Sequence, residues 1–400
     1  MKIFILKMPY SIPYILLICF FLLIATFQLG VQLDQKTRRY LNYIVILTYI
    51  LFFGFRGFVG WDWYNYYPYF TNLPNFTNLP TISNFIPEKN RYEFGFSLFS
   101  VLIKSINPDY NFYILINCIV NITLLSIFLK RYVPSNLFAF SLVTFIVMEG
   151  FILEVNLLRN IKSVLLFLIS LRYIENRKFF KFLILNLLGV LFHWSAIIYL
   201  PLYFFLHKKV DLRVYFFIFI IGNIIYLFQI QYVKPVVLFL ASLMGKVAHG
   251  KAEGYLSSKI FGIQYGITFG YLERVTTSLL IMFYYNKLIN RSKSNILFIN
   301  SFFIFFVVYF FFSEISVLVN RVGILFFFSY WILWPQIIEV SERVTKHLLF
   351  FFMAIYLNVR IISMTNNILY KYDNIMFENC QSYQERLKVY EKHSKQLQKK

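Results

Sequence analysis

Residues 304–312 read Ile-Phe-Phe-Val-Val-Tyr-Phe-Phe-Phe, nine apolar or aromatic side chains without a polar interruption. A strand of a membrane β-barrel alternates apolar and polar residues, and this stretch does not alternate. Apolar runs of about 17–25 residues suit membrane-spanning helices, and such runs recur along the chain from residue 12 onward. We therefore expect an all-α, polytopic integral membrane protein with about 10–13 transmembrane or half-membrane helices.

The charged residues are few and unevenly placed. The 400 residues are 59% hydrophobic and 14% charged, with a formal net charge of +21, a composition that excludes an ordinary soluble domain. The basic residues gather between apolar runs, as in cytoplasmic loops of membrane proteins. No RNA- or DNA-binding motif accompanies them, so we expect no nucleic-acid partner. The clusters are Lys36/Arg38/Arg39, Lys130/Arg131, Arg177/Lys178/Lys181, Lys208/Lys209/Arg213, Lys287/Arg291/Lys293 and Arg343/Lys346.

With these clusters on the cytoplasmic side, the loops 56–93 and 231–267 and the segment 314–321 lie on the opposite face. We expect a single polytopic membrane domain over residues 1–363 and a polar, basic tail over residues 364–400, with a surface helix at 383–398. The other expected helices lie near 12–30, 41–55, 111–129, 137–153, 158–174, 214–230, 268–286, 295–312, 322–340 and 347–363.

Two segments do not suit a simple span. A helix over residues 94–106 would be about 20 Å long, too short for a hydrocarbon core of about 30 Å, so we expect it to be re-entrant or interfacial. Residues 182–206 must begin and end on the cytoplasmic side, which predicts a hairpin of two half-helices with its tip at 192–195. A single tilted span is the alternative, and it would invert the orientation of everything downstream.

Under this orientation the ionisable residues on the non-cytoplasmic face form one candidate set. A charge at a membrane edge is costly and is a functional-site hypothesis by default. A guanidinium fork is the best bidentate partner for phosphate or carboxylate, so the arginines of the set suit a phosphate-bearing substrate. The alternative is that each anchors its helix or pairs with a carboxylate. The set is Arg56, Asp62, Glu93, Arg159, His193, Glu314 and Arg321.

Asp62 lies between Trp61 and Trp63 in a loop rich in tyrosine. In a concave pocket, the aromatic faces would cover the apolar faces of sugar rings, while Asp62 and Asn65 would hydrogen-bond hydroxyl groups. An aromatic belt at the membrane interface is the alternative.

His193 lies between apolar half-segments, where a histidine is more often a buried core residue. At an accessible hairpin tip it would instead act as a general base, because its ordinary pKa lies near neutrality. Glu314 and Arg321 share a face if their segment is helical, which fits a shared site and a plain salt bridge equally.

No cofactor is indicated by the sequence. The three cysteines are scattered, and they have neither disulfide nor metal-ligand spacing. The chain has no nucleotide-binding loop, zinc-peptidase motif or nucleophile elbow. We expect neither a metal nor a cofactor.

Several short motifs follow one another in a definite order and spacing, and together they resemble the EpsG family, whose members are polytopic proteins related to Wzy-type polymerases of O-antigen or capsule polysaccharide. The resemblance covers most of residues 12–360. Lys162 and Trp194 depart from the residues more common in the family. The motifs are Arg56-Gly-x-x-Gly-x-Asp62-x-x-Asn65-Tyr66, Glu93-Phe-Gly95, Leu158-Arg159-Asn160, Tyr173-Ile-Glu-Asn-Arg177-Lys178 and Phe192-His193-Trp194-Ser195-Ala196.

The resemblance implies a multi-pass glycosyltransferase of the bacterial plasma membrane with a GT-C-like architecture. Such an enzyme polymerises undecaprenyl-pyrophosphate-linked oligosaccharide repeats on the outer face without a metal. Its partners would be the lipid-linked donor and acceptor, membrane lipid and a chain-length regulator protein. The alternatives are a flippase of the same repeats and a membrane acyltransferase that modifies surface sugars.

The resemblance, together with the charge pattern, also suggests roles for individual residues. Fixed cations would neutralise the leaving pyrophosphate, since electrostatic stabilisation of developing charge is usually the largest catalytic contribution. The substrate-binding candidates are Arg159, Arg321, Arg56, Asn65, Tyr66 and Glu93. The candidates for the base that accepts the hydroxyl proton are, in order, Asp62, His193 and Glu314.

Overall fold

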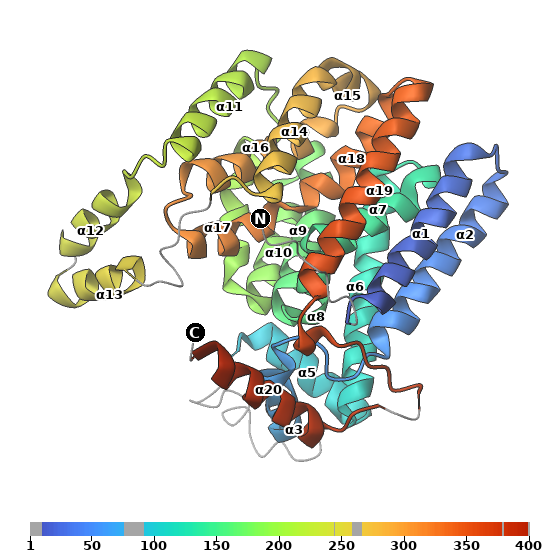
Figure 1. Cartoon of the computed structure of the whole chain (residues 1–400), viewed down its shortest axis with the longest axis vertical. Coiled ribbons are helices and arrows are strands. Elements are labelled where there is room, and N and C mark those ends of the chain that lie inside the picture. The colour runs from blue at the N-terminus through green and yellow to red at the C-terminus, as the bar shows by residue number, and fades with distance from the viewer. Residues whose placement is uncertain (1–9, 76–91, 244, 258–265, 378–379, 399–400) are drawn as a thin grey trace. The chain divides into compact units, whose positions relative to one another are not determined.

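The computed structural model describes residues 10–75, 92–243, 245–257, 266–377 and 380–398. The regular structure in these ranges is helical, which confirms the expected all-α fold (Figure 1). The chain divides into two compact units. The first contains residues 1–203 and 347–400, and the second contains residues 204–346. The tail, which we expected to be separate from a single membrane domain, is therefore grouped with the first unit.

Most helices of the first unit come from the N-terminal half of the chain. They are α1 Ile12–Gly30, α2 Gln35–Tyr49, α3 Trp63–Asn72, α5 Phe94–Ile106, α6 Tyr110–Tyr132, α7 Phe138–Phe145, α8 Phe151–Val155, α9 Leu158–Glu175 and α10 Phe179–Phe192. A 3₁₀ helix, Trp194–Phe204, follows α10, and the helices α19 Arg343–Thr365 and α20 Tyr383–Gln398 lie near the C-terminus. Two π-helical turns, Ile50–Gly54 and Ile146–Gly150, extend α2 and α7.

The helices of the second unit are shorter. They are α11 Leu212–Leu227, α12 Val233–Leu243, α13 Lys246–Ser257, α14 Phe269–Phe283, α15 Tyr285–Arg291, α16 Asn295–Phe311, α17 Ser316–Gly323 and α18 Phe328–Val340.

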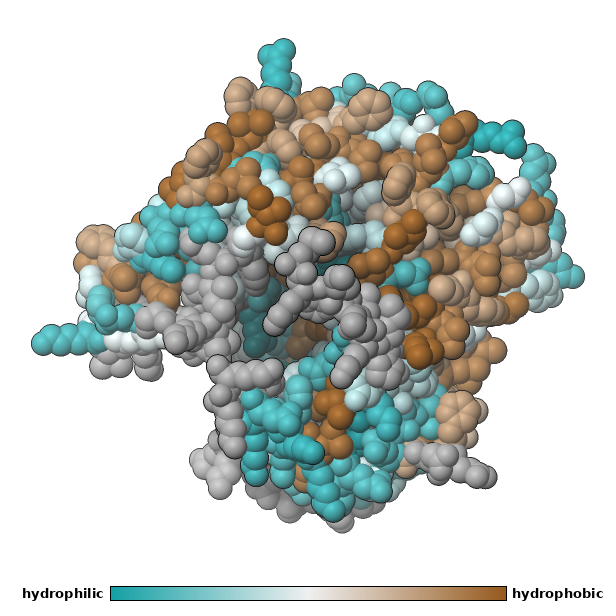
Figure 2. Space-filling model, in the orientation of Figure 1, coloured by the Kyte–Doolittle hydropathy of each residue, from teal (hydrophilic) through white to brown (hydrophobic). Residues whose placement is uncertain are grey.

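Four helical segments of the described residues are long and apolar enough to cross a membrane alone: α1, α6, the stretch Ser135–Val155 and α19. A bent pair, Leu318–Phe326 with Phe328–Val340, would make a fifth, and six further apolar helices have 10–17 residues. The predicted helices are thus present, but several are shorter or more broken than a simple span. On the viewed face, hydrophobic residues cover α1 and α19, whereas hydrophilic residues gather over α20 (Figure 2).

The predicted hairpin at residues 182–206 is confirmed. Helix α10 has 14 residues and so is about 21 Å long. It ends before His193, and the chain then turns back. Tyr199 stacks on Phe167 of α9 with ring centroids 3.8 Å apart. Tyr203 lies 5.0 Å from the ring of Phe179, so the chain returns to the level at which α10 began.

The C-terminal tail packs against the loop that follows α2. Helix α20 has the bounds expected from the sequence, and it contributes two stacked aromatic pairs. Tyr383 stacks on Tyr67 at 4.2 Å and Tyr390 stacks on Tyr64 at 4.4 Å. The tail and the loop therefore pack together within the first unit.

Arg386 attaches α20 to the rest of the unit. Its side chain is only 1% exposed and donates hydrogen bonds to the carbonyl oxygens of Phe58 at 2.8 Å and Leu369 at 2.9 Å. Hydrogen bonds from a charged donor are the stronger ones in proteins. The sequence suggested no role for this arginine, because both carbonyls come from distant segments.

We expect Arg386→Ala to destabilise the protein by about 3 kcal/mol, because two charge-assisted hydrogen bonds are lost and two carbonyls remain buried. The measurement is the thermal unfolding midpoint of detergent-purified protein. Lys388→Ala, which removes an exposed charge from the same helix, should leave the midpoint unchanged. Equal midpoints for Arg386→Ala and the wild type would contradict the anchoring role.

Candidate functional site

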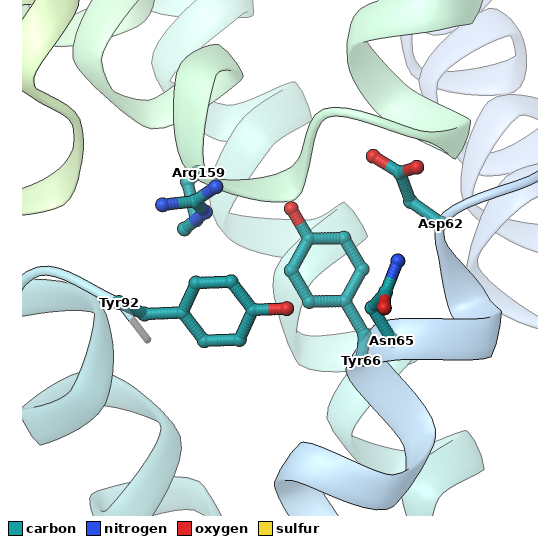
Figure 3. A pocket seen from close by; sticks show the side chains of 5 residues that line it. All are labelled: Asp62, Asn65, Tyr66, Tyr92 and Arg159. Carbon is teal, nitrogen blue, oxygen red and sulfur yellow. The ribbon is translucent and has the colours of Figure 1, made fainter. Parts of the chain in front are cut away.

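A pocket of about 280 Å³ lies in the first unit and is lined by Asp62, Asn65, Tyr66, Tyr92 and Arg159 (Figure 3). The lining residues come from the loop before α3, from α3, from the segment before α5 and from the first turn of α9. The structure thus brings together a carboxylate, an amide, two phenols and a guanidinium. All but Tyr92 were named from the sequence.

Asp62 precedes α3 without using its carboxylate as a cap. Its backbone carbonyl accepts hydrogen bonds from the N–H groups of Asn65 at 2.9 Å and Tyr66 at 3.0 Å. The side chain makes no capping bond, although aspartate is a preferred capping residue. Asp62 is half-buried and lines the pocket, so its carboxylate points to where a ligand would lie rather than to the helix end.

Gly60 and Asn156 determine how the loop approaches α9. Gly60 has φ +91°, a conformation that only glycine adopts readily. A Cβ atom there would lie 2.3 Å from Oδ1 of Asn156. The same Oδ1 accepts the N–H of Trp61 at 2.8 Å. Asn156 was not predicted from the sequence, because its partner lies 95 positions away.

Arg159 is held by a carboxylate and an aromatic ring. Its Nη1 donates to Oε2 of Glu93 at 2.6 Å, and its guanidinium lies 4.4 Å from the ring centroid of Tyr92. The side chain is 22% exposed, and its buried Nε has no hydrogen-bond partner in the structure. The predicted alternative of an ion pair is present here, and the arginine still lines the pocket.

The phenol of Tyr66 lies between the guanidinium and the carboxylate in the view of Figure 3. Burial raises its pKa well above the ordinary value, more than the nearby Arg159 charge lowers it. Burial likewise raises the pKa of Tyr69 to about 12. Both phenols therefore remain neutral donors at physiological pH. Tyr66 and Phe70 are buried among residues of α5 and α6, so much of the aromatic loop forms a packed core.

Glu93 connects the arginine to the tip of the hairpin. Its second oxygen, Oε1, accepts the N–H of Trp194 at 3.4 Å. This contact requires α5 and α10 to lie close together, and Gly95 permits it, because a Cβ atom there would lie 2.8 Å from the backbone oxygen of Leu191. Glu93 is thus a positioning residue for Arg159.

His193 lies at the hairpin tip, as predicted, but its geometry limits its use as a base. Nδ1 accepts the backbone N–H of Ser195 at 3.2 Å and lies 2.7 Å from the Ser195 hydroxyl. A ring nitrogen that accepts an N–H carries no proton, so the neutral imidazole has its proton on Nε2. His193 is not among the residues that line the pocket. Asp62, in contrast, lines the pocket.

Arg56 belongs to a buried polar network rather than to the pocket lining. Its side chain is 4% exposed. It donates to the carbonyl oxygens of Phe53 and Glu154, and it lies 3.7 Å from the Glu154 carboxylate. Asn121 donates to the other oxygen of that carboxylate at 3.0 Å. Arg56 was predicted to bind substrate; its guanidinium is held by groups of the fold and is not among the residues that line the pocket, and its role in substrate binding stays a prediction.

The two remaining candidates lie in the second unit. The Glu314 carboxylate is 1% exposed and accepts the N–H groups of Tyr232, Val233 and Lys234 at 2.6, 2.8 and 3.1 Å. It caps α12 with both carboxylate oxygens, and its role as a base stays a prediction. Helix α17 begins after Glu314, so the face that Glu314 was expected to share with Arg321 is absent. Arg321 is exposed, and its role in substrate binding stays a prediction.

Two residues of the pocket and of the Arg56 network were not predicted, although the sequence contains a signal for each. Tyr92 directly precedes the Glu93-Phe-Gly95 motif, and Glu154 is a carboxylate within an apolar run. Among the described residues, no group of three or more histidine, cysteine, aspartate or glutamate side chains is placed to hold a metal.

Comparison with known proteins identifies a family for this chain. The sequence model of the EpsG family matches residues 39–377, a range that contains every residue lining the pocket. No curated protein and no solved structure matches the chain.

We expect Arg56→Gln to reduce the amount of folded protein, because it leaves the Glu154 carboxylate buried without its counter-charge. Breaking a buried pair in this way costs about 3–5 kcal/mol. The measurement is the monodisperse fraction in gel filtration after extraction. The double variant Arg56→Gln/Glu154→Gln should recover much of the monodisperse fraction, since neither of these two charges remains. A well-folded Arg56→Gln protein that no longer supports function would instead restore Arg56 to the substrate site.

Proposed function

We propose, from the premise that this chain belongs to the EpsG family, that it is a membrane glycosyltransferase of polysaccharide biosynthesis. It joins lipid-linked oligosaccharide repeats into a long surface polysaccharide on the outer face of a bacterial plasma membrane. The single observation that carries the proposal is the pocket in which the Arg159 guanidinium and the Asp62 carboxylate lie together. Such a pair suits a reaction with an anionic leaving group and a proton to remove.

The proposed reaction is a transfer between two undecaprenyl-pyrophosphate-linked glycans. A hydroxyl oxygen of the acceptor sugar forms a bond to the anomeric carbon of the donor. The bond between that carbon and the pyrophosphate oxygen breaks, and the carrier pyrophosphate leaves with the electron pair. The hydroxyl proton passes to the Asp62 carboxylate, which acts as the general base.

Arg159 supplies positive charge to the leaving pyrophosphate. Fixed donors aimed at developing charge need no reorganisation during the reaction, and Glu93 and Tyr92 hold this guanidinium from two sides. Arg159 lines the pocket, so its guanidinium would contact a phosphate oxygen bound there. Tyr66 and Asn65 would donate hydrogen bonds to sugar hydroxyls or phosphate oxygens from the same wall.

We expect Arg159→Ala to lower polymer synthesis by about 100–1,000-fold, the usual effect of removing one charge-stabilising donor. Arg159→Lys should recover little, because an ammonium lacks the planar fork. The measurement is the length distribution of surface polysaccharide on a gel, in a deletion strain that expresses each variant.

The same experiment distinguishes the alternatives. A polymerase defect leaves single repeats at the cell surface, a flippase defect traps them inside, and an acyltransferase defect changes acetyl content without changing chain length. Immunoblotting must find Arg159→Ala in the membrane at the wild-type amount. Normal long chains in that variant would remove Arg159 from the site, and trapped repeats would overturn the polymerase proposal.

A further inference from the structure

A buried arginine with no hydrogen-bond or ion-pair partner among the described residues lies in the second unit. Arg274, in the second turn of α14, is 8% exposed, although its helix was expected to lie within the membrane. The part of the chain that the structure describes contains no carboxylate in ion-pair contact with it and no hydrogen bond from its guanidinium. Its buried Nε is without an acceptor. A buried charge of this kind is costly unless it is paired.

The other buried arginines that we have described are satisfied by protein groups. Arg56 contacts Glu154, and Arg386 contacts two carbonyl oxygens. The first unit therefore shows how this protein neutralises a structural arginine. Arg274 lacks such partners, which distinguishes it from a cation that serves only the fold.

The Arg274 guanidinium lies over two aromatic rings. Its central carbon is 3.7 Å from the ring centroid of Tyr309 and 5.3 Å from that of Phe305, both in α16. Tyr309 in turn stacks on Tyr226 at 5.6 Å. An aromatic ring stabilises a guanidinium over its face without using the N–H groups of the guanidinium as hydrogen-bond donors. Those donors are the groups that would contact an anion.

The guanidinium also lies at the positive end of its own helix. Its Nη1 would be 2.5 Å from a Cβ atom on Gly270, one turn nearer to the N-terminus, where Thr268 caps α14. Helix N-termini favour anions and disfavour cations. Two positive groups are therefore placed together, and an anion bound there would be stabilised by both.

We propose that Arg274 and the first turn of α14 form a binding site for the phosphate group of a lipid. This inference rests on the proposed function. Because the polymerase must hold a donor and an acceptor, the ligand is the pyrophosphate of the second lipid-linked substrate. The Arg159 pocket holds the phosphate of one carrier and the Arg274 site holds that of the other. The same chemistry would recognise a phospholipid headgroup, so the source has to be tested.

Native mass spectrometry of the detergent-purified full chain tests the proposal, with undecaprenyl pyrophosphate and phosphatidylglycerol as separate probes. The wild type should bind two molecules of undecaprenyl pyrophosphate. Arg274→Gln and Gly270→Ala should each bind one, the first because the charge is lost and the second because the new methyl group displaces the guanidinium. The control Gly254→Ala, whose Cβ would enter open space, should bind two.

The variants separate this inference from the proposed function. Arg159→Gln should also bind one molecule, and Arg159→Gln/Arg274→Gln should bind none. If Arg274→Gln binds one molecule fewer than the wild type and Arg159→Gln binds as many as the wild type, the α14 site is supported and the Arg159 pocket is contradicted. If phosphatidylglycerol binds the Arg274 site as well as undecaprenyl pyrophosphate does and displaces it, the site recognises a phospholipid headgroup. That result would overturn the assignment to the second substrate. Unchanged binding of both lipids in Arg274→Gln would overturn the site itself.

Discussion

The ion pair between Arg56 and Glu154 is the interaction on which the geometry of the pocket depends. A guanidinium inside apolar packing requires a counter-charge and hydrogen-bond acceptors. The Glu154 carboxylate of α8 supplies the counter-charge, and the carbonyl oxygens of Phe53 and Glu154 accept the hydrogen bonds of Arg56. The pair joins two segments that continue directly into the pocket. One leads through Gly60 to Asp62, and the other leads through Asn156 to Arg159.

The arginines of this protein differ in their partners rather than in their local sequence. Arg56 is surrounded by acceptors, and Arg159 is held by Glu93 at the edge of a pocket. Arg274 lies over aromatic rings, and the described residues offer its Nε no acceptor. A guanidinium within a membrane protein is costly in each case, so its role follows from what neutralises it. Acceptors on every side indicate a fold contact, whereas a place at the edge of a pocket leaves room for a ligand.

The tail illustrates how distant segments complete a site. Helix α20 stacks tyrosines against Tyr64 and Tyr67, and Arg386 binds the carbonyl of Phe58. These contacts fix α20 against the aromatic loop next to Asp62. A basic, polar terminal segment would ordinarily be expected to be solvated, and here its one buried arginine makes it part of the loop's support.

The sequence by itself determined the fold class, the positions of most helices and the break at residue 193, because these follow from local apolar patterns and helix length. It also identified Asp62, Asn65, Tyr66 and Arg159. Only the tertiary structure decided that Arg56 and Glu314 are occupied by the fold, that Tyr92 joins the pocket, and that Arg274 is unpartnered. The physical reason is that the free energy of a buried charge depends on its acceptors, which come from residues far away along the chain.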